Sequence, residues 1–192
     1  DGLKQALKIR QFWYWLIITF IGLGLFNGIS TWIEGIVRPR GFTPTIAGDL
    51  GAVMLVGGVI GAVALPALSD KTRKRQLFLY IGIALAIPGL IGVAFARTLL
   101  PLLASGFFLG FFLVSANPIG MQYSAEVTFP VPEGTLNGLI QLFGQASVVF
   151  VYIMEALRAS DGSFTYALLV GAAALLLCLV LVSRMKDVKA QI

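Results

Sequence analysis

The sequence predicts an all-α membrane protein whose chain crosses the bilayer six times. Apolar residues make up 58% of the 192 positions, and charged residues make up only 12%. A water-soluble domain of this size needs a polar exterior, because much of its surface stays exposed to solvent. Six apolar runs also reach the length of about 20 residues that a helix needs to cross the hydrocarbon core. Lipid, rather than water, is the solvent that fits this composition.

The six predicted spans follow one another through short connections. They cover residues 12–36, 46–68, 77–96, 99–122, 135–157 and 164–183. Ahead of them, residues 1–11 place apolar side chains at helical spacing, which predicts a linker helix lying in the cytoplasmic membrane interface. The bundle then occupies residues 12–184, and residues 185–192 form a cytoplasmic tail.

The positive charges predict the orientation of the bundle. Six spans place both ends of the chain on one face, together with the loops 70–76 and 123–134, and ten of the 14 Lys and Arg residues lie there. Because positive residues favour the cytoplasmic side, we expect a cell-membrane protein with both ends of this segment in the cytoplasm. The net charge of +5 arises at these helix ends, without a basic stripe interleaved with aromatic residues, so no nucleic-acid partner is predicted.

The residues that carry chemistry disfavour an enzyme. The chain has no His, and its single cysteine, Cys178, lies inside an apolar run. Disulfide frameworks and His- or multi-Cys metal sites are therefore excluded within the chain. No nucleophile constellation is present either, so we expect no cofactor, no metal and no covalent catalysis. A membrane enzyme, or a subunit of one, remains the disfavoured alternative.

Small residues and prolines predict how the spans pack. The second span contains Gly57-x-x-x-Gly61 and the fourth contains Gly106-x-x-x-Gly110, pairs that allow two helix backbones to approach closely. Three prolines lie inside the second, third and fourth spans: Pro66, Pro88 and Pro118. A proline frees a backbone carbonyl, so we expect these prolines to break or bend their spans. Three aromatic residues at the start of the first span suit an interfacial belt: Trp13, Tyr14 and Trp15.

Uncharged polar side chains lie within the apolar runs of the first, fourth and fifth spans. They are Asn27, Asn117, Asn137, Gln141 and Gln145. The last three are spaced four residues apart and so share one helix face. A polar stripe that faces lipid is costly, so this face points to the bundle interior or to water. We expect Asn27, Asn117, Gln141 and Gln145 to line a solute-binding cavity. The alternative is amide hydrogen bonding between helices, worth about 0.6 kcal/mol per bond.

The connection between the second and third spans carries the clearest motif. Residues 66–75 read Pro-Ala-Leu-Ser-Asp-Lys-Thr-Arg-Lys-Arg. They resemble the loop pattern G-x-L-a-D-[RK]-x-G-[RK]-[RK] of the major facilitator superfamily. The matching positions are Leu68, Asp70, Lys71, Lys74 and Arg75. Pro66 and Arg73 stand where glycine is usual, so we expect the turn geometry to differ from the usual one.

The resemblance implies a gating role for this loop. In that superfamily the aspartate caps a helix and pairs with basic groups, which holds the cytoplasmic gate shut, and this role falls to Asp70. Glu126, at the cytoplasmic end of the fourth span, faces the same compartment and would complete an ion-pair relay with Arg73 or Arg75. The alternative is an ordinary positive loop, which explains the basic residues but not an aspartate at that spacing.

A second stretch is more specific. Residues 126–139 read Glu-Val-Thr-Phe-Pro-Val-Pro-Glu-Gly-Thr-Leu-Asn-Gly-Leu. This resembles the E-x-T-[FY]-P-x-x-E-[GA]-x-x-x-G-L signature of the feline leukaemia virus subgroup C receptor (FLVCR) family. Similar stretches at residues 28–31 and 70–74 extend the resemblance over about residues 22–147. The members of that family carry choline, ethanolamine or haem-related solutes. Asn27 stands where its choline carriers have an aromatic residue, so the sequence does not predict an aromatic choline cage at this position.

These resemblances imply the C-terminal half of a twelve-span major facilitator carrier. Six spans make one of the two halves, and the substrate site lies between the halves. We therefore expect three partners: the N-terminal half of the same transporter, a small organic solute and the lipid bilayer. Transport would proceed by alternating access. Two alternatives are a complete six-span protein that works as a homodimer and a membrane subunit without transport activity.

Overall fold

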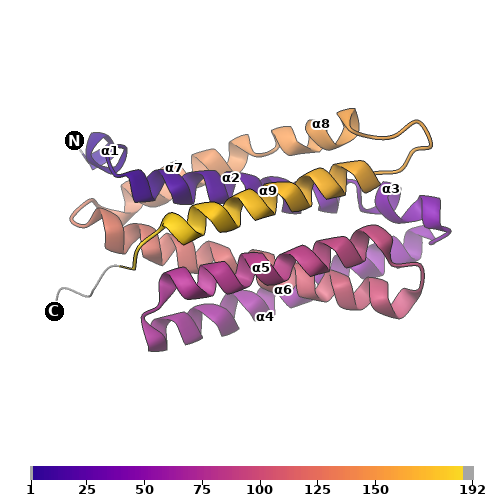
Figure 1. The fold of residues 1–192 in the computed structure, drawn as a ribbon, viewed down its shortest axis with the longest axis horizontal. Coiled ribbons are helices and arrows are strands. Elements are labelled where there is room, and N and C mark those ends of the chain that lie inside the picture. Colours follow the sequence, from indigo (N-terminus) through magenta and orange to yellow (C-terminus); the bar gives the residue numbers. More distant parts are fainter. Residues whose placement is uncertain (1, 188–192) are drawn as a thin grey trace.

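The computed structural model describes residues 2–187, whose helices run side by side along one direction (Figure 1). The elements are α1 (Gly2–Ala6), α2 (Arg10–Thr31), α3 (Ile33–Val37), η1 (Arg38–Arg40), α4 (Pro44–Thr72), α5 (Arg75–Phe95), α6 (Leu99–Thr128), α7 (Glu133–Ala146), α8 (Val149–Ala156) and α9 (Thr165–Arg184). Within this part of the chain, six helical stretches are long and apolar enough to cross a membrane, with α7 and α8 together forming one of them. The predicted all-α, six-span fold is therefore confirmed.

The connections gather at two opposite ends of the bundle. One end holds the turn between α4 and α5, the start of α2 and the end of α9, and is called the Arg75 end below (Figure 1). The opposite end holds η1 and the connections from α5 to α6 and from α8 to α9, and is called the Arg40 end. Every long helix therefore runs from one end to the other.

The first predicted span differs from the helices of the structure at both of its ends. The first span was expected to continue through residue 36, but α2 ends at Thr31 and α3 begins after Trp32. The indole nitrogen of Trp32 donates a hydrogen bond to the carbonyl of Val151, 2.9 Å away, and its ring stacks on Phe164 at 5.3 Å between centroids. These contacts fix Trp32 against α8 and the start of α9, and the chain changes direction there. At the other end of the first span, residues 10 and 11 of the expected linker already belong to α2.

The prediction that the three prolines break their spans was wrong, whereas a bend at these prolines stays a prediction. Helices α4, α5 and α6 each continue through their internal proline. The break falls instead in the fifth span, between α7 and α8, where Ser147 and Val148 lie outside both helices. There the Ser147 hydroxyl and its backbone N–H both donate to the carbonyl of Gly144. A serine that bonds back to its own helix, with a tightened last turn, competes with regular α-helical bonding. A proline, by contrast, removes one backbone hydrogen bond, and the surrounding turns can continue.

Helices α4 and α6 approach each other more closely than side chains normally allow. A Cβ atom at Gly61 would lie 2.0 Å from the carbonyl oxygen of Phe111, and one at Gly110 would lie 2.0 Å from the carbonyl oxygen of Met54. Only residues without a side chain permit backbones this near. The two small-residue pairs predicted from the sequence therefore pack against each other's helix, and that prediction is confirmed.

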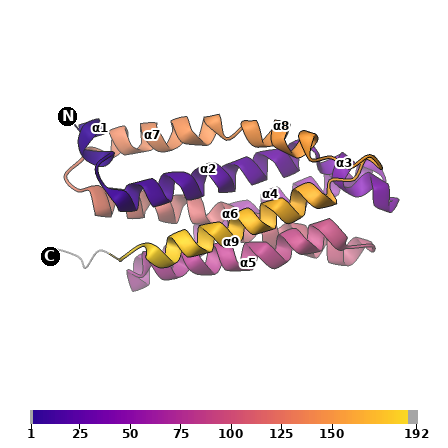
Figure 2. The same ribbon diagram turned by 45° about the horizontal axis from the view of Figure 1, so that its top comes forward.

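Glycines also allow α6 to pack closely against α5 and α2. A Cβ atom at Gly89 of α5 would lie 2.8 Å from the backbone nitrogen of Leu109, and one at Gly120 would lie 2.0 Å from the Trp15 ring. Helix α6 thus lies between α4 and α5 and also touches α2 (Figure 2). It is the central helix of the bundle, and its surroundings set the shape of the site described below.

Helix α2 meets α8 through a groove that the sequence analysis did not single out. Gly24 and Gly28 lie one turn apart on α2, and their missing side chains leave room for Phe150 and Met154 of α8. A Cβ atom at either glycine would lie 2.4 Å from one of these side chains. The α8 half of the fifth span is therefore held on α2 by two side chains in a glycine groove.

The outer surface of α4 is apolar along its length. Leu55, Val56, Val59, Ile60 and Val63 are each between 47% and 69% exposed. Soluble monomers rarely expose a continuous apolar strip of this kind. Lipid or a second helical bundle is the surrounding that suits it.

Candidate functional site

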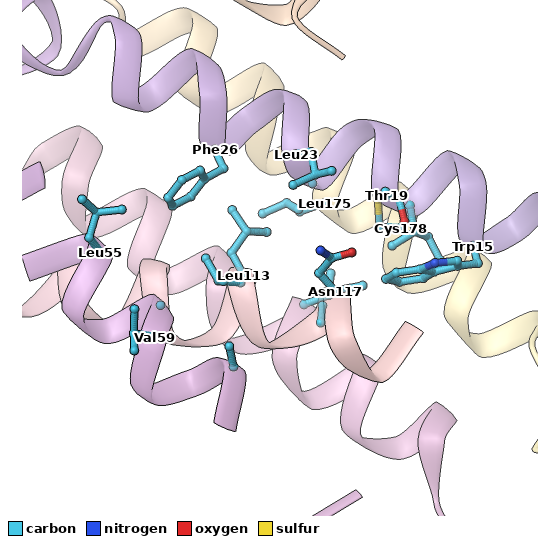
Figure 3. Close-up of a pocket in the computed structure, with 17 residues that line it drawn as sticks. Trp15, Thr19, Leu23, Phe26, Leu55, Val59, Leu113, Asn117, Leu175 and Cys178 are labelled. Atoms are coloured by element: carbon cyan, nitrogen blue, oxygen red, sulfur yellow. The ribbon is translucent and has the colours of Figure 1, made fainter. Parts of the chain in front are cut away.

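An apolar cavity of about 280 Å³ lies between α2 and α4, with α6 beside both (Figure 3). Its 17 lining residues are Trp15, Ile18, Thr19, Gly22, Leu23, Phe26, Leu55, Gly58, Val59, Ala62, Ile83, Leu113, Val114, Ala116, Asn117, Leu175 and Cys178. Leu55 and Val59 are also more than half exposed, so the cavity opens on the surface of the bundle. Its volume lies near the lower limit of ligand pockets, about 300–1,000 Å³.

The cavity exists because α2 and α4 carry small residues on the helix faces that line it. A Cβ atom at Gly22 would touch just one atom within 4 Å, the Cδ1 of Leu113 at 3.9 Å. Most of the volume beside Gly22 is therefore empty. This contrasts with Gly61 and Gly110, whose missing side chains are replaced by the backbone of the neighbouring helix.

Three residues of the cavity wall each carry a buried polar atom that has no hydrogen-bond partner among the described residues. These atoms are the indole nitrogen of Trp15, the hydroxyl of Thr19 and the side-chain oxygen of Asn117. Trp15 is 1% exposed and Thr19 is 4% exposed. In Figure 3 the Asn117 amide projects from α6 towards the side of α2 that bears Thr19 and Trp15. Buried polar groups are normally hydrogen-bonded, so these three atoms are exceptions among the side chains of the cavity wall.

The four predicted solute-binding residues occupy different positions. Asn117 lines the cavity, whereas Asn27, Gln141 and Gln145 do not. These three are exposed side chains on α2 and α7. Gln145 also stands two residues before Ser147, at the end of α7 where the fifth span breaks. Their part in solute binding stays a prediction.

Trp15 and Thr19 were missed as site residues by sequence reasoning. Trp15 was assigned to an interfacial belt together with Trp13, but it is buried in the cavity wall while Trp13 is 38% exposed. The belt assignment was therefore wrong for Trp15. A signal was present in the spacing, because Trp15, Thr19, Gly22 and Phe26 fall on one helix face at intervals of four, three and four residues.

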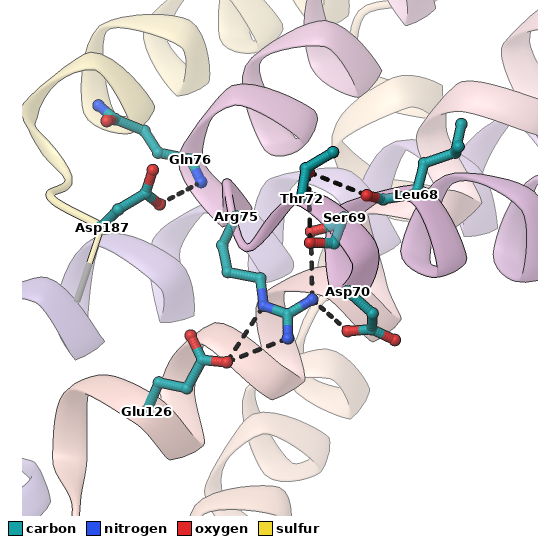
Figure 4. Close-up of polar contacts among 8 residues, drawn as sticks. All are labelled: Leu68, Ser69, Asp70, Thr72, Arg75, Gln76, Glu126 and Asp187. Carbon is teal, nitrogen blue, oxygen red and sulfur yellow. Dashed lines mark hydrogen bonds and ion pairs between the residues drawn. The ribbon is translucent and has the colours of Figure 1, made fainter. Parts of the chain in front are cut away.

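A second cluster, at the Arg75 end, is built around a buried arginine (Figure 4). The Arg75 guanidinium donates through Nε and Nη2 to one carboxylate oxygen of Glu126, at 3.2 and 3.1 Å. Its Nη1 atom donates to Asp70 and, at 3.2 Å, to the hydroxyl of Ser69. The Arg75 side chain is 9% exposed, against 62% for Asp70 and 32% for Glu126. A single cation thus joins the end of α4, the start of α5 and the end of α6.

Arg73 has a different place from the one expected. Among the described residues, the ion pairs to Asp70 and Glu126 are made by Arg75 and not by Arg73. Arg73 is exposed and follows α4 with φ of 55°, the left-handed region that glycine favours. The chain therefore adopts a left-handed turn of the kind that glycine favours, although arginine stands there, and a difference from the usual turn of the superfamily stays a prediction.

Further polar contacts tie the segment after α9 to the same end. The Gln11 side-chain oxygen accepts from the Lys186 backbone N–H at 2.9 Å and also contacts the Tyr123 hydroxyl. Gln76 donates its backbone N–H to Asp187 at 2.8 Å. Residues 185–187 of the expected tail are therefore fixed to α2, α5 and α6. Residues 188–192 lie outside the described part of the chain.

Charged residues also gather at the Arg40 end. Arg40 donates to the carbonyl of Ala96 at 2.7 Å, which joins η1 to the connection between α5 and α6. Burial lowers the pKa of the Arg40 guanidinium from its ordinary value, although arginine stays charged at neutral pH. Two further ion pairs lie at this end, with Glu34 3.9 Å from Arg38 and with Glu155 3.2 Å from Arg158.

The sequence of this bundle matches a known family over nearly its whole length. Residues 14–191 match the sequence model described as Major Facilitator Superfamily. The chain belongs to the Major Facilitator Superfamily. The resemblance of the basic loop at the Arg75 end to the loop pattern of this superfamily predicted the same membership, and that prediction is confirmed.

Individual relatives show which members of the Major Facilitator Superfamily this chain is similar to. An uncharacterized protein of Archaeoglobus fulgidus is 33% identical over 184 residues, which cover 95% of this chain and 83% of that protein. Solute carrier family 49 member A3 of Danio rerio is 32% identical over 86% of this chain and 36% of its own length. The choline/ethanolamine transporter flvcr2a of Danio rerio is 30% identical over 70% of this chain and 30% of its own length. The predicted resemblance to the FLVCR family is confirmed.

The names of these relatives indicate a class of function for this chain, and their lengths show how much of each relative it covers. Two of them are named as carriers, so the comparisons support membrane transport, rather than catalysis, for a multi-pass membrane protein. The chain spans about a third of the length of the two Danio rerio carriers but most of the length of the archaeal relative. Within the described residues, no group of three or more metal-binding side chains occurs.

Proposed function

We propose that this chain is the C-terminal half of a twelve-helix carrier that moves a small organic solute across the cell membrane by alternating access. The observation that carries the proposal is the cavity between α2 and α4, which opens on one side of the bundle. In this superfamily architecture, the substrate site lies between two halves, so each half contributes part of the wall. An open cavity on a six-helix bundle is what one half would contribute.

The proposal places the Arg75 end in the cytoplasm and the N-terminal half against the open side of the cavity. Asn27, Gln141 and Gln145 then complete the solute site from α2 and α7. The Arg75 cluster works as a cytoplasmic gate: Asp70 keeps most of its surface exposed while it holds Arg75, and so remains available to a group on the other half. The bilayer covers the remaining apolar surface.

Alternating access has a consequence that does not require the solute to be known. The wall of the cavity must be reachable by water from each side of the membrane in turn. We would place a single cysteine at Val59, in the full-length protein without other cysteines, and apply an impermeant maleimide to right-side-out and to inside-out vesicles. We expect labelling in both preparations.

The matched control is Val180→Cys on α9. Val180 is also more than half exposed but does not line the cavity, so it should face lipid and resist the reagent from either side. Labelling of Val59→Cys from one side alone, or from neither, would contradict alternating access. It would favour the membrane subunit without transport activity.

A homodimer of six-helix chains is the second candidate. The specific observation in its favour is the archaeal relative, of which the aligned region covers 83%. The two candidates differ in composition, because the first has one twelve-helix chain and the second has two copies of one six-helix chain. Native mass spectrometry of the purified protein distinguishes them, and a pair of identical six-helix chains would replace the first candidate with the second.

A further inference from the structure

We propose that the Arg40 end of the bundle binds a small zwitterion in a polar pocket separate from the α2–α4 cavity. In this pocket Arg38 binds the acid group of the ligand, and Glu34 and Asp161 bind its ammonium group. The inference goes beyond the proposed function and does not depend on it. The pocket shares no lining residue with the α2–α4 cavity, and its ligand need not be transported.

The polar pocket lies between the segment that follows α2 and the connection from α8 to α9. Figure 1 and Figure 2 both place α3 and this connection at the Arg40 end. The volume of the pocket is about 570 Å³, within the range of ligand pockets, about 300–1,000 Å³. The lining residues used below are Trp32, Glu34, Arg38, Arg158, Asp161 and Phe164.

Contacts within the protein give the pocket a defined shape. The rings of Trp32 and Phe164 stack and so join the two segments that form it. The Arg158 guanidinium lies over the Phe164 ring, 5.5 Å from its centroid. It also donates to Glu155 at 3.2 Å and to the carbonyl of Gly162 at 3.3 Å. Arg158 is therefore occupied by the protein, and its main effect is to hold the α8–α9 connection in place.

Arg38 is the cation that a ligand can reach. Its side chain is 78% exposed, and its guanidinium lies 3.9 Å from Glu34, which is too long for a hydrogen bond. Exposed ion pairs of this kind contribute little, so Arg38 can turn towards another anion at small cost. A guanidinium presents its N–H groups as a planar fork that fits the two oxygens of a carboxylate or a phosphate. Arg38 is therefore suited to the acid group of a ligand.

Two carboxylates flank the pocket from its two segments. Glu34 belongs to α3 and is more than half exposed, and Asp161 belongs to the α8–α9 connection. One oxygen of Asp161 accepts from the backbone N–H of Ser163 at 2.8 Å, and this bond lowers the pKa of the Asp161 carboxyl. Asp161 is therefore ionised at neutral pH. A carboxylate has about four acceptor sites on two oxygens, so Asp161 keeps the capacity to accept from an ammonium group.

The balance of charge in the pocket favours a ligand that carries both signs. Two arginines and two acids are among the described residues that line it, so their formal charges cancel. An anion attracted to Arg38 also meets the repulsion of Glu34 and Asp161, and a cation attracted to these acids meets the repulsion of the arginines. A zwitterion can place each of its charges beside an opposite one.

Four probes of nearly the same shape test this assignment. They are β-alanine, a zwitterion; β-alaninamide, a cation; butanoate, an anion; and butanamide, which is neutral. The full-length protein in detergent would carry Ser160→Cys labelled with a trifluoromethyl group, in a Cys178→Ala background without other cysteines. Ser160 is exposed and lies beside Asp161 without lining the pocket. The fluorine NMR signal would be followed during each titration, at neutral pH and low salt.

We expect β-alanine to bind about fivefold more tightly than β-alaninamide or butanoate, the upper effect of one exposed ion pair. Arg38→Gln should remove the advantage of β-alanine over β-alaninamide. The double variant Glu34→Gln with Asp161→Asn should remove its advantage over butanoate. Asparagine can still accept from the Ser163 N–H, so the connection keeps its turn. High salt should reduce both advantages, because the charges are exposed.

Arg97→Gln and Asp49→Asn are the matched controls. Arg97 and Asp49 are exposed charges near the Arg40 end that do not line the pocket. Each control removes one charge of the same sign as the corresponding pocket variant, so an effect of net charge alone would appear in it. The preference for β-alanine should survive both controls. The unfolding temperature of every variant, measured in the same detergent, shows whether the protein is folded.

Three results would overturn the inference. Equal affinity for the four probes in the parent protein would show that the pocket does not recognise charge. A preference for β-alanine that survives both Arg38→Gln and the double variant would place its recognition elsewhere. A preference lost equally in the controls would arise from the field of the whole end and not from the pocket. If the double variant does not fold, Arg38→Gln and its control still decide the result.

The zwitterion can come from solution or from the headgroup of a membrane lipid, and competition distinguishes these sources. The β-alanine titration would be repeated with phosphatidylethanolamine or phosphatidylglycerol added to the detergent. Competition by phosphatidylethanolamine alone would support the inference and identify a zwitterionic headgroup as the source. Competition by neither lipid would support a soluble zwitterion. Equal competition by phosphatidylglycerol, whose headgroup is an anion, would contradict selection for a zwitterion and overturn the inference.

Discussion

At the scale of single residues, Arg75 and its two carboxylates connect three helices. The guanidinium is 9% exposed and bonds to side chains of α4 and α6. Removing one partner from a buried pair is usually worse than replacing the whole pair, because a charge is left uncompensated. Asp70 is mostly exposed, however, so its contribution to folding is smaller than its position suggests. Folding and gating can therefore be separated at this residue.

The first prediction is that Asp70→Asn reduces transport far more than it reduces folded protein. A gate residue shifts the inward–outward equilibrium by its differential interaction, and about 1–3 kcal/mol changes transport about 5–150-fold. The measurement is uptake into liposomes, with choline and ethanolamine as the first solutes tested, normalised to folded protein. Asp49→Asn is the control, because Asp49 is an exposed aspartate on the same helix near the Arg40 end. Uptake by Asp70→Asn at the parent rate would reduce the motif to an ordinary positive loop.

The second prediction concerns the glutamines of α7. Gln141→Ala and Gln145→Ala should each weaken solute binding about 5–150-fold, because a solute group that loses its partner in a desolvated site costs about 1–3 kcal/mol. Asn137→Ala should have less effect, because Asn137 lies about 12 Å along the helix from Gln145. Binding of the transported solute to purified full-length protein measures this. If both glutamine variants bind as the parent does, these exposed amides lie outside the solute site.

At the scale of elements, the bundle combines a tightly packed part with looser parts. Helices α4 and α6 meet backbone to backbone through glycines on both sides. The α2–α8 contact has side chains in a glycine groove, and α7 and α8 are separated by the break at Ser147 and Val148. Close backbone packing gives dispersion contacts over the whole length of a pair, which holds helices together in lipid. The α4–α6 pair is therefore the rigid side of the cavity.

The third prediction tests that rigidity. Gly61→Ala places a Cβ atom where the structure has the carbonyl of Phe111 2.0 Å away, so the helices must separate. Overpacking of this kind costs about 1–3 kcal/mol. Gly48→Ala is the matched control on the same helix, because a Cβ atom there meets nothing within 4 Å. Thermal or denaturant unfolding in detergent should show Gly61→Ala destabilised and Gly48→Ala unchanged or slightly more stable, since alanine favours a helix more than glycine does. Equal stabilities would contradict the close packing of α4 and α6.

At the scale of the whole molecule, the positive charge is concentrated at one of the two ends of the bundle. The basic loop, the start of α2 and the end of α9 share the Arg75 end, where most of the positive charge lies. Arg40 and the connection between α5 and α6 lie at the other end. A helical bundle in a bilayer places these ends in different compartments, and the positive-inside rule is the basis for our proposal that the Arg75 end is cytoplasmic.

The fourth prediction is this orientation. Thr43 and Thr72 are exposed residues at opposite ends of α4. Single cysteines at these positions, in a Cys178→Ala background without other cysteines, would be treated with an impermeant maleimide on intact cells. We expect labelling at Thr43→Cys, and labelling at Thr72→Cys only after the cells are permeabilised. The reverse pattern would invert the topology and place the Arg75 cluster outside the cytoplasm.

The sequence by itself determined the class of fold, the number of spans and the family. Each of these depends on composition, run length or local motif, which are properties of neighbouring residues. Hydropathy over about 20 residues counts spans because lipid requires each crossing to satisfy its own backbone. The pairing of small residues between the second and fourth spans could also be read locally, because the glycines repeat every four residues.

The tertiary structure alone decided which of these residues meet. Trp15 belongs to an aromatic run that suits the membrane interface. It is buried in the bundle instead, because the missing side chain of Gly120 on α6 leaves room for its ring. Arg75 and Arg73 are equally basic in the sequence, and the left-handed turn at Arg73 decides which of them reaches Glu126. The cavity also depends on the distance between two helices that are separated along the chain by α3 and η1. A periodicity shows which face of a helix a residue occupies, but what lies opposite that face is set by the packing of the other helices.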